Sequence, residues 1–198
     1  MDICSIILSA GKGNRMLSDI PKPLHIICGK PMIQWVIDAN KAVNIKKSII
    51  VIPDRNKSFK NITSEFDTVI QPKPLGTGDA VKIAVNLLEK FSGIVLVCFA
   101  DTPFISSKSL QTIIKAFKND TKLVISGFEK KEKNSYGKIF FTKHNSPVEI
   151  IEQKDAEKKN VNSNFCNGGI MAMHSSVLSY LNKIKKNSIT NEYYLTDI

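Results

Sequence analysis

The chain of 198 residues is poor in the residues that build metal clusters and disulfide frameworks. Its four cysteines are widely spaced and form no Cys-x-x-Cys pair, which predicts reduced, buried or incidental thiols rather than a zinc site or a disulfide. Its three histidines do not have the spacing of metal ligands, and we assign them no catalytic role. We therefore expect neither a structural zinc nor an extracellular disulfide scaffold.

Long apolar runs and targeting segments are also missing. No run reaches the roughly 18 residues that a membrane span needs. Residues 1–10 are apolar but have no basic leader and no small-residue cleavage site, so they predict a buried strand rather than a signal peptide. The sequence thus predicts a cytoplasmic protein without a membrane partner.

Basic charge is plentiful, but it comes almost entirely from lysine. The formal net charge is +10, and the only arginines are Arg15 and Arg55. The lysines are spread along the chain, and no aromatic residues are interleaved with them. This pattern favours a solvated basic surface over a nucleic-acid-binding face, so we expect no nucleic-acid partner.

Strand and helix patterns alternate over the first 120 residues. Strands are predicted at residues 3–9, 48–52, 68–70 and 93–99, and helices at 31–43, 77–88 and 107–117. The alternation predicts an α/β fold with a Rossmann-like, mostly parallel sheet and helices on both faces. Shorter strands are then predicted at residues 123–128, 137–141, 148–152 and 169–173, with a mobile loop at 156–164 and a helix at 175–181. We expect these to form a smaller mixed-strand extension within one domain, 1–198.

A glycine-containing loop follows the first predicted strand. It contains Gly11, Gly13 and Arg15, and Lys22 follows within Pro-Lys-Pro-Leu. Glycines allow backbone N–H groups to approach a triphosphate closely, and the two cations can bind phosphate oxygens. The loop has neither the Walker A ending nor the Gly-x-Gly-x-x-Gly pattern of dinucleotide sites. It therefore predicts a phosphate-binding loop of another kind.

An acidic residue, Asp101, follows the predicted strand 93–99. Ligands of open α/β sheets bind beyond the carboxyl ends of the strands, and a carboxylate there suits a hard cation such as Mg²⁺. Asp101 is therefore the candidate metal ligand. The alternative is an aspartate that only opens a turn before Pro103.

A second glycine-containing segment spans residues 75–80. Gly76 and Gly78 permit close approach of a ligand, and Thr77 can form hydrogen bonds with it. Thr77 could instead cap the helix that follows, and both interpretations can hold together.

Together these segments resemble the sugar-nucleotide pyrophosphorylases. Gly-x-Gly-x-Arg-Met at residues 11–16 is followed by Pro21-Lys22, Leu24-His25 and then Gly-Lys-Pro-Met at residues 29–32. This continuation closely resembles the uridylyltransferase domain of bacterial N-acetylglucosamine-1-phosphate uridylyltransferases, which are bifunctional enzymes that also carry an acetyltransferase domain. Further matches run in order to the end of the chain, at residues 71–72, 75–80, 101–103, 136–139, 151–156, 167–169 and 192–198.

The resemblance implies an Mg²⁺-dependent transferase. It would join UTP and N-acetylglucosamine 1-phosphate to give UDP-N-acetylglucosamine, a precursor of peptidoglycan and lipopolysaccharide, and pyrophosphate. Arg15 and Lys22 would be catalytic, and Asp101 would bind the metal. The residues implied to bind the nucleotide are Leu8, Ala10, Gly11, Gly13, Lys22, Gln71, Gly76 and Thr77. Those implied to bind the sugar substrate are Asp101, Gly137, Glu152, Asn167, Tyr194 and Thr196.

Two features depart from the family pattern. Phe99-Ala100 stands where the family usually has Tyr-Gly, which removes a hydroxyl and adds a methyl beside the site, so we expect a weaker contact with substrate or a narrower site. We also expect the chain to be shortened, because Ile198 precedes the asparagine that gives the family its second metal ligand, and the acetyltransferase domain is absent. Acetyltransferase activity is not expected, and the oligomeric state stays open. The alternatives are another sugar-1-phosphate nucleotidyltransferase and a nucleotide-binding module that has lost catalysis.

Overall fold

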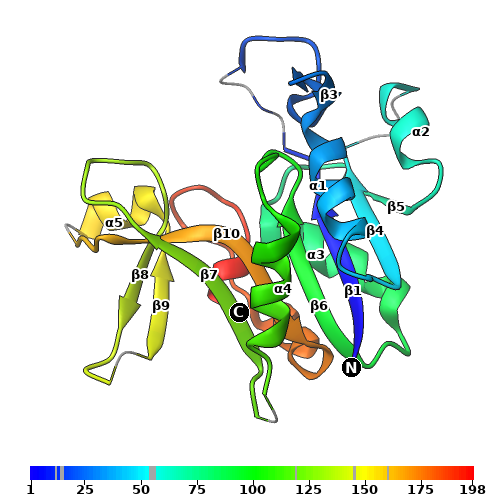
Figure 1. The fold of residues 1–198 in the computed structure, drawn as a ribbon. Helices are drawn as coiled ribbons and strands as arrows, with labels where there is room; N and C mark the ends of the chain where they lie inside the picture. Colours follow the sequence, from blue (N-terminus) through cyan, green and yellow to red (C-terminus); the bar gives the residue numbers. More distant parts are fainter. Residues whose placement is uncertain (12, 14–15, 54–56, 119, 145, 160) are drawn as a thin grey trace.

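Eight strands form a mixed sheet at the centre of the computed structural model, which describes the chain except residues 12, 14–15, 54–56, 119, 145 and 160 (Figure 1). Four adjacent strands are parallel, in the order β5 (Asp67–Ile70), β4 (Lys47–Ile52), β1 (Asp2–Leu8) and β6 (Gly93–Phe99). The antiparallel part consists of β10 (Phe165–His174), β7 (Leu123–Glu129), β8 (Lys138–Phe141) and β9 (Pro147–Ile151). The predicted fold class is confirmed.

Helices cover both faces of the parallel strands, because successive residues of each strand point to opposite sides. In β1, Ile6 packs in the same core as Val81 of α3 (Thr77–Val85), which covers one face. The next residue, Ile7, packs in a second core with residues of α1 (Met32–Lys41) and α4 (Ser107–Lys115). Figure 1 shows these two helices on the face of the sheet opposite α3. The side chains of Ile6, Ile7 and Val81 are fully buried.

The strand order places a crevice at one end of the sheet. The chain runs from β1 outward through β4 to β5, then returns to the other side of β1 to form β6. Connections that leave a central strand in opposite directions open a crevice at the carboxyl ends of the strands. The loops that begin at Ser9, after β1, and at Ala100, after β6, meet at this edge, where Ala100 N donates to Leu8 O at 2.9 Å.

Several smaller elements complete the chain. They are η2 (Lys22–Leu24), β2 (Ile26–Ile27), β3 (Lys30–Pro31), α2 (Lys57–Thr63), η3 (Asn86–Leu88), α5 (Gln153–Lys159), η4 (Ser175–Lys183) and η5 (Leu195–Asp197). Among the described residues, no helix is long and apolar enough to cross a bilayer.

One local prediction was wrong, and one helix was not predicted. The predicted loop at 156–164 begins inside α5, which is stabilised at its two ends by an aspartate in the first turn and lysines in the last turn. The helix predicted at 175–181 is confirmed as the 3-10 helix η4, which extends to Lys183. The helix α2 was not predicted, because only Phe59 and Ile62 give it an apolar side. Local propensity did not reveal elements that depend on tertiary contacts.

Candidate active site

A cleft of about 820 Å³ opens at the carboxyl ends of β1 and β6. Each described residue that the sequence predicted to bind nucleotide or substrate lines it. These residues are Leu8, Ala10, Gly11, Gly13, Lys22, Gln71, Gly76, Thr77, Asp101, Gly137, Glu152, Asn167, Tyr194 and Thr196. Arg15, the other predicted catalytic residue, lies outside the described residues. The structure therefore brings residues from distant parts of the chain to one cavity.

An ion pair crosses the cleft between its two best candidates for chemistry. Lys22 Nζ lies 2.5 Å from Asp101 Oδ2, and each side chain is about one third exposed, at 35% and 34%. Lys22 begins η2, while Asp101 lies just beyond β6. The pair thus joins the loop after β1 to the tip of the neighbouring strand, and both of its residues line the cleft.

Gly13 allows Lys22 to reach this position. Its φ of +61° lies in the left-handed region, and a Cβ at this residue would lie 2.7 Å from Cβ of Lys22. Any other residue would meet both a backbone cost and a collision with the lysine stem. Gly13 therefore allows the ammonium group of Lys22 to reach the cleft. This role is separate from any contact between the loop backbone and a ligand.

The second glycine segment packs closely against the C-terminal end of the chain. A Cβ at Gly76, whose φ is +104°, would collide with the backbone oxygen of Tyr193, and a Cβ at Gly78 would lie 3.1 Å from the same atom. Gly78 N donates to Tyr193 O at 2.8 Å, and Tyr193 N donates to Leu75 O at 2.7 Å. The close approach that these glycines permit is thus that of the C-terminal segment, residues 192–198, although Gly76 also lines the cleft.

The alternative interpretation of Thr77 as a helix cap is wrong. Thr77 is the first residue of α3, and Gly76 holds the N-cap position without a side-chain bond. The Thr77 hydroxyl instead accepts a hydrogen bond from Leu195 N at 3.0 Å. It therefore fixes the C-terminal segment on the start of α3.

Gln71, which is 5% exposed, is held in place at the end of β5. Its Nε2 donates to Gly76 O at 3.0 Å and to Asp79 Oδ2 at 2.8 Å. These two bonds satisfy both amide hydrogens. Because none of the described residues donates to its Oε1, this oxygen is free to accept a hydrogen bond from a ligand.

The antiparallel strands build the other side of the cleft. Thr196 Oγ1 donates to Glu152 Oε1 at 3.1 Å, and Asn167 N donates to Gly137 O at 2.8 Å. Asn167 Oδ1 accepts from Gly169 N at 3.0 Å, which leaves its amide hydrogens for a ligand. The hydroxyl of Tyr194, another residue that lines the cleft, donates to Thr190 Oγ1 at 2.7 Å.

The electrostatics of this side differ from those at Lys22. Burial raises the pKa of Glu152, the hydrogen bond from Thr196 partly opposes this, and the nearby charge of Asp197 raises it further. Burial likewise raises the pKa of Asp197, together with the charge of Asp155. Acidic groups therefore crowd the side predicted to bind sugar, where an uncharged hydroxyl would be a favourable neighbour.

Glu152→Gln should stabilise the fold at neutral pH. The pKa of Glu152 is raised above its ordinary 4.5 in the folded state, so wild-type stability decreases as pH rises from 4.5 through the folded pKa. Glutamine keeps the oxygen that accepts from Thr196 but carries no charge. We expect the melting temperature of the variant to exceed that of the wild type at pH 7 and to equal it near about pH 3. Glu89→Gln, on the exposed surface, is the control; a variant no more stable than wild type at pH 7 would contradict this assignment.

Sequence reasoning missed several cleft residues. Ser9 is 2% exposed, and its hydroxyl has no hydrogen-bond partner in the described part of the chain, although it lines the cleft. Its place between two predicted residues, Leu8 and Ala10, was the available signal. Phe99 also lines the cleft, but Ala100 is fully buried in the core on the far side of the sheet. The extra methyl at residue 100 thus does not narrow the site.

Comparison with known families settles the class of this domain. Residues 5–182 match the family described as the MobA-like NTP transferase domain. The chain belongs to this family. The match of the MobA-like NTP transferase domain runs from the middle of β1 to η4, and it therefore includes both sides of the cleft.

Individual relatives agree with this assignment. The domain is 36% identical over 203 residues to the Bifunctional protein GlmU of Ruegeria sp. (strain TM1040), covering 100% of this chain and 45% of that protein. It is 34% identical over 198 residues to the Bifunctional protein GlmU of Parvibaculum lavamentivorans, covering 98% of this chain and 44% of that protein. The chain thus spans less than half the length of these relatives, and the resemblance predicted from its motifs is confirmed.

A solved structure shares the architecture of this MobA-like NTP transferase domain. The crystal structure of a UDP-glucose pyrophosphorylase complexed with UDP-glucose superposes with a TM-score of 0.76 and 21% sequence identity, and the match covers 100% of this chain and 85% of that one. At this level of identity the likeness shows the fold. It confirms a mixed, Rossmann-like sheet with helices on both faces.

Proposed function

We propose that this domain transfers the uridylyl group of UTP to N-acetylglucosamine 1-phosphate, with release of pyrophosphate. The proposal rests on one observation. A single cleft combines a glycine-containing loop suited to binding phosphate, the Lys22–Asp101 pair and an acidic side suited to binding sugar hydroxyls. The similarity to GlmU proteins over the whole chain supports the choice of substrates. Since UTP is an intracellular metabolite, we place the reaction in the cytoplasm.

Within this proposal, the parallel half of the sheet binds the nucleotide. The free amide oxygen of Gln71 accepts a hydrogen bond from an N–H of the base, and the backbone after β1 approaches the phosphates. The ammonium of Lys22 binds a phosphate oxygen, and Arg15 has the same role on the departing pyrophosphate. Hydroxyl and acetamido groups of the sugar meet Glu152 and Asn167 on the opposite side.

The donor groups of the cleft fit a magnesium ion held mainly by substrate. Among the described residues, no group of three or more His, Cys, Asp or Glu side chains could hold a metal. Mg²⁺ is commonly bound by one or two carboxylates together with phosphate oxygens and water, and Asp101 supplies one such carboxylate. When bound, the ion would neutralise charge on the triphosphate. Asp101 would then exchange its bond to Lys22 for one to the metal, which frees the lysine for phosphate.

The chemical step needs no covalent enzyme intermediate. An oxygen of the sugar 1-phosphate is already anionic at neutral pH, so it attacks the α-phosphorus of UTP directly. A new P–O bond forms while the bond from the α-phosphorus to the bridging oxygen breaks, and pyrophosphate leaves with the electron pair. The contribution of the protein is positioning and charge neutralisation by residues such as Lys22.

Pyrophosphate release tests the proposal. With Mg²⁺ and N-acetylglucosamine 1-phosphate we expect release with UTP at a kcat/KM at least about 100-fold above that with CTP, because only uracil offers the matching base edge. Glucose 1-phosphate, with a hydroxyl in place of the acetamido group, is the matched acceptor control. Preference for another acceptor or nucleotide would indicate a different sugar-1-phosphate nucleotidyltransferase. Metal-dependent UTP binding without turnover would indicate a domain that has lost catalysis.

A further inference from the structure

A buried lysine lies directly behind the sugar side of the cleft. Lys138, the first residue of β8, is 4% exposed, and no carboxylate in the described part of the chain pairs with it. Its Nζ donates to Asn134 Oδ1 at 2.7 Å and to Cys166 Sγ at 3.5 Å. A buried ammonium is costly unless hydrogen bonds or an opposite charge compensate the loss of water, so the position of Lys138 depends on these two bonds.

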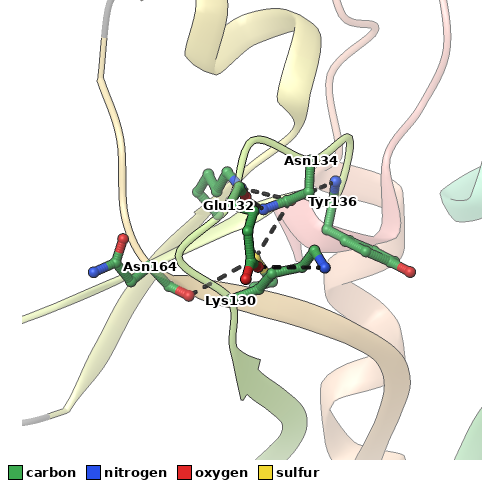
Figure 2. A network of polar contacts seen from close by, with 7 residues as sticks. Lys130, Glu132, Asn134, Tyr136 and Asn164 are labelled. Carbon is green, nitrogen blue, oxygen red and sulfur yellow. Dashed lines mark hydrogen bonds and ion pairs between the residues drawn. The ribbon is translucent and has the colours of Figure 1, made fainter.

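Its principal partner, Asn134, organises the loop that precedes β8 (Figure 2). The Oδ1 atom of Asn134 also accepts from Tyr136 N at 3.1 Å, and its Nδ2 donates to the carbonyl of Glu132 at 2.8 Å. Tyr136 is held from the side by the ring of Phe128, with the ring centroids 5.0 Å apart and edge to face. Lys138 thus fixes the oxygen of Asn134 that also accepts the backbone N–H of Tyr136.

The pairing of β8 with β10 connects Lys138, which lies behind the sheet, to residues that line the cleft. Lys138 pairs in register with Cys166, which is fully buried, and their neighbours Gly137 and Asn167 are joined by the bond from Asn167 N to Gly137 O. Since adjacent strand residues point to opposite faces, Lys138 and Cys166 lie behind the sheet while their neighbours line the cleft. A change at Lys138 therefore acts on cleft residues that it does not touch.

We propose that Lys138 and Asn134 are positioning residues for the sugar 1-phosphate. They hold the segment 135–137, all three residues of which line the cleft, in the conformation that receives the sugar. This inference rests on the proposed function. It predicts an effect on the sugar substrate alone, because the nucleotide side of the cleft is built from other strands.

Steady-state kinetics of Lys138→Met provide the test. Methionine keeps the length and burial of the side chain but removes its donors. We expect the KM for the sugar 1-phosphate to rise about tenfold, and the KM for UTP to change less than about twofold, as fits the loss of one buried hydrogen-bonded contact. Lys138→Arg, which retains a cationic donor, should recover most of the wild-type KM. Lys131→Met, an exposed lysine of the same loop, is the control for charge.

Amide hydrogen exchange of the intact protein gives an independent readout. Lys138→Met should speed exchange at residues 135–137 while β1 and β6 stay protected as in the wild type. Equal changes in both KM values and kcat, or unchanged exchange at 135–137, would overturn the positioning role and leave the proposed function intact. If the wild type turns over no sugar 1-phosphate, the proposed function fails, and the exchange data alone decide whether Lys138 orders this segment.

Discussion

Replacing Asp101 by asparagine is expected to lower the kcat for pyrophosphate release by about 10²- to 10³-fold, the usual loss when a group that stabilises transition-state charge is removed. Asparagine has nearly the same shape but no charge, so it binds a metal ion on the triphosphate much more weakly than the carboxylate does. It also leaves Lys22 without its ionic partner at 2.5 Å. The measurement is coupled detection of pyrophosphate at saturating UTP and sugar 1-phosphate.

The fold of this variant should be almost unaffected. The Lys22–Asp101 pair is about one third exposed, and partly exposed ion pairs contribute about 1 kcal/mol or less to stability. Asp38→Asn is the matched control, because Asp38 pairs with Lys30 at 2.6 Å with similar exposure but does not line the cleft. Near-normal turnover by Asp101→Asn, or an equal loss in Asp38→Asn, would rule out the role assigned to Asp101.

Gly76→Ala is expected to lower the free energy of unfolding by about 2–4 kcal/mol, the sum of a forbidden backbone conformation and an overpacked contact. The φ of +104° disfavours any side chain, and the added Cβ would lie 2.8 Å from Tyr193 N and collide with the oxygen of the same residue. The C-terminal segment must move to relieve this collision. Because that segment lines the cleft, the affinity for nucleotide and sugar should fall as well. Urea denaturation monitored by circular dichroism measures the loss.

Gly11→Ala separates this effect from the general cost of replacing a loop glycine. A Cβ at Gly11 would meet no atom within 4 Å, so its free energy of unfolding should stay within about 1 kcal/mol of the wild type. Wild-type stability in Gly76→Ala would show that the C-terminal segment is not packed against α3 as described.

The parts of the site that depend on strand order could be predicted from sequence. Asp101 and Gly11 each follow an apolar strand, and parallel strands bring their carboxyl ends to one edge. The fold class followed from the same alternation. By contrast, the residues predicted from family resemblance alone, such as Glu152 and Asn167, carry no local pattern that marks them as ligand-binding. Their roles remain predictions, although the structure places them on the cleft.

Features that depend on contacts between distant segments could not be predicted. The glycines at 76 and 78 indicate only that something approaches closely, and the sequence does not say that the approaching group is Tyr193. The bond between Thr77 and Leu195 has the same origin. Lys138 would be assigned to the surface by its residue type, and only the fold shows that it is buried.

The C-terminal segment touches both halves of the cleft. Its Tyr193 and Leu195 bond to the start of α3 on the side proposed to bind nucleotide, while Thr196 bonds to Glu152 on the side proposed to bind sugar. Because the segment is short and hydrogen-bonded at both ends, a displacement at one end would displace the other. Occupancy by the first substrate would therefore alter the affinity for the second, and by linkage the reverse change would be equal in size.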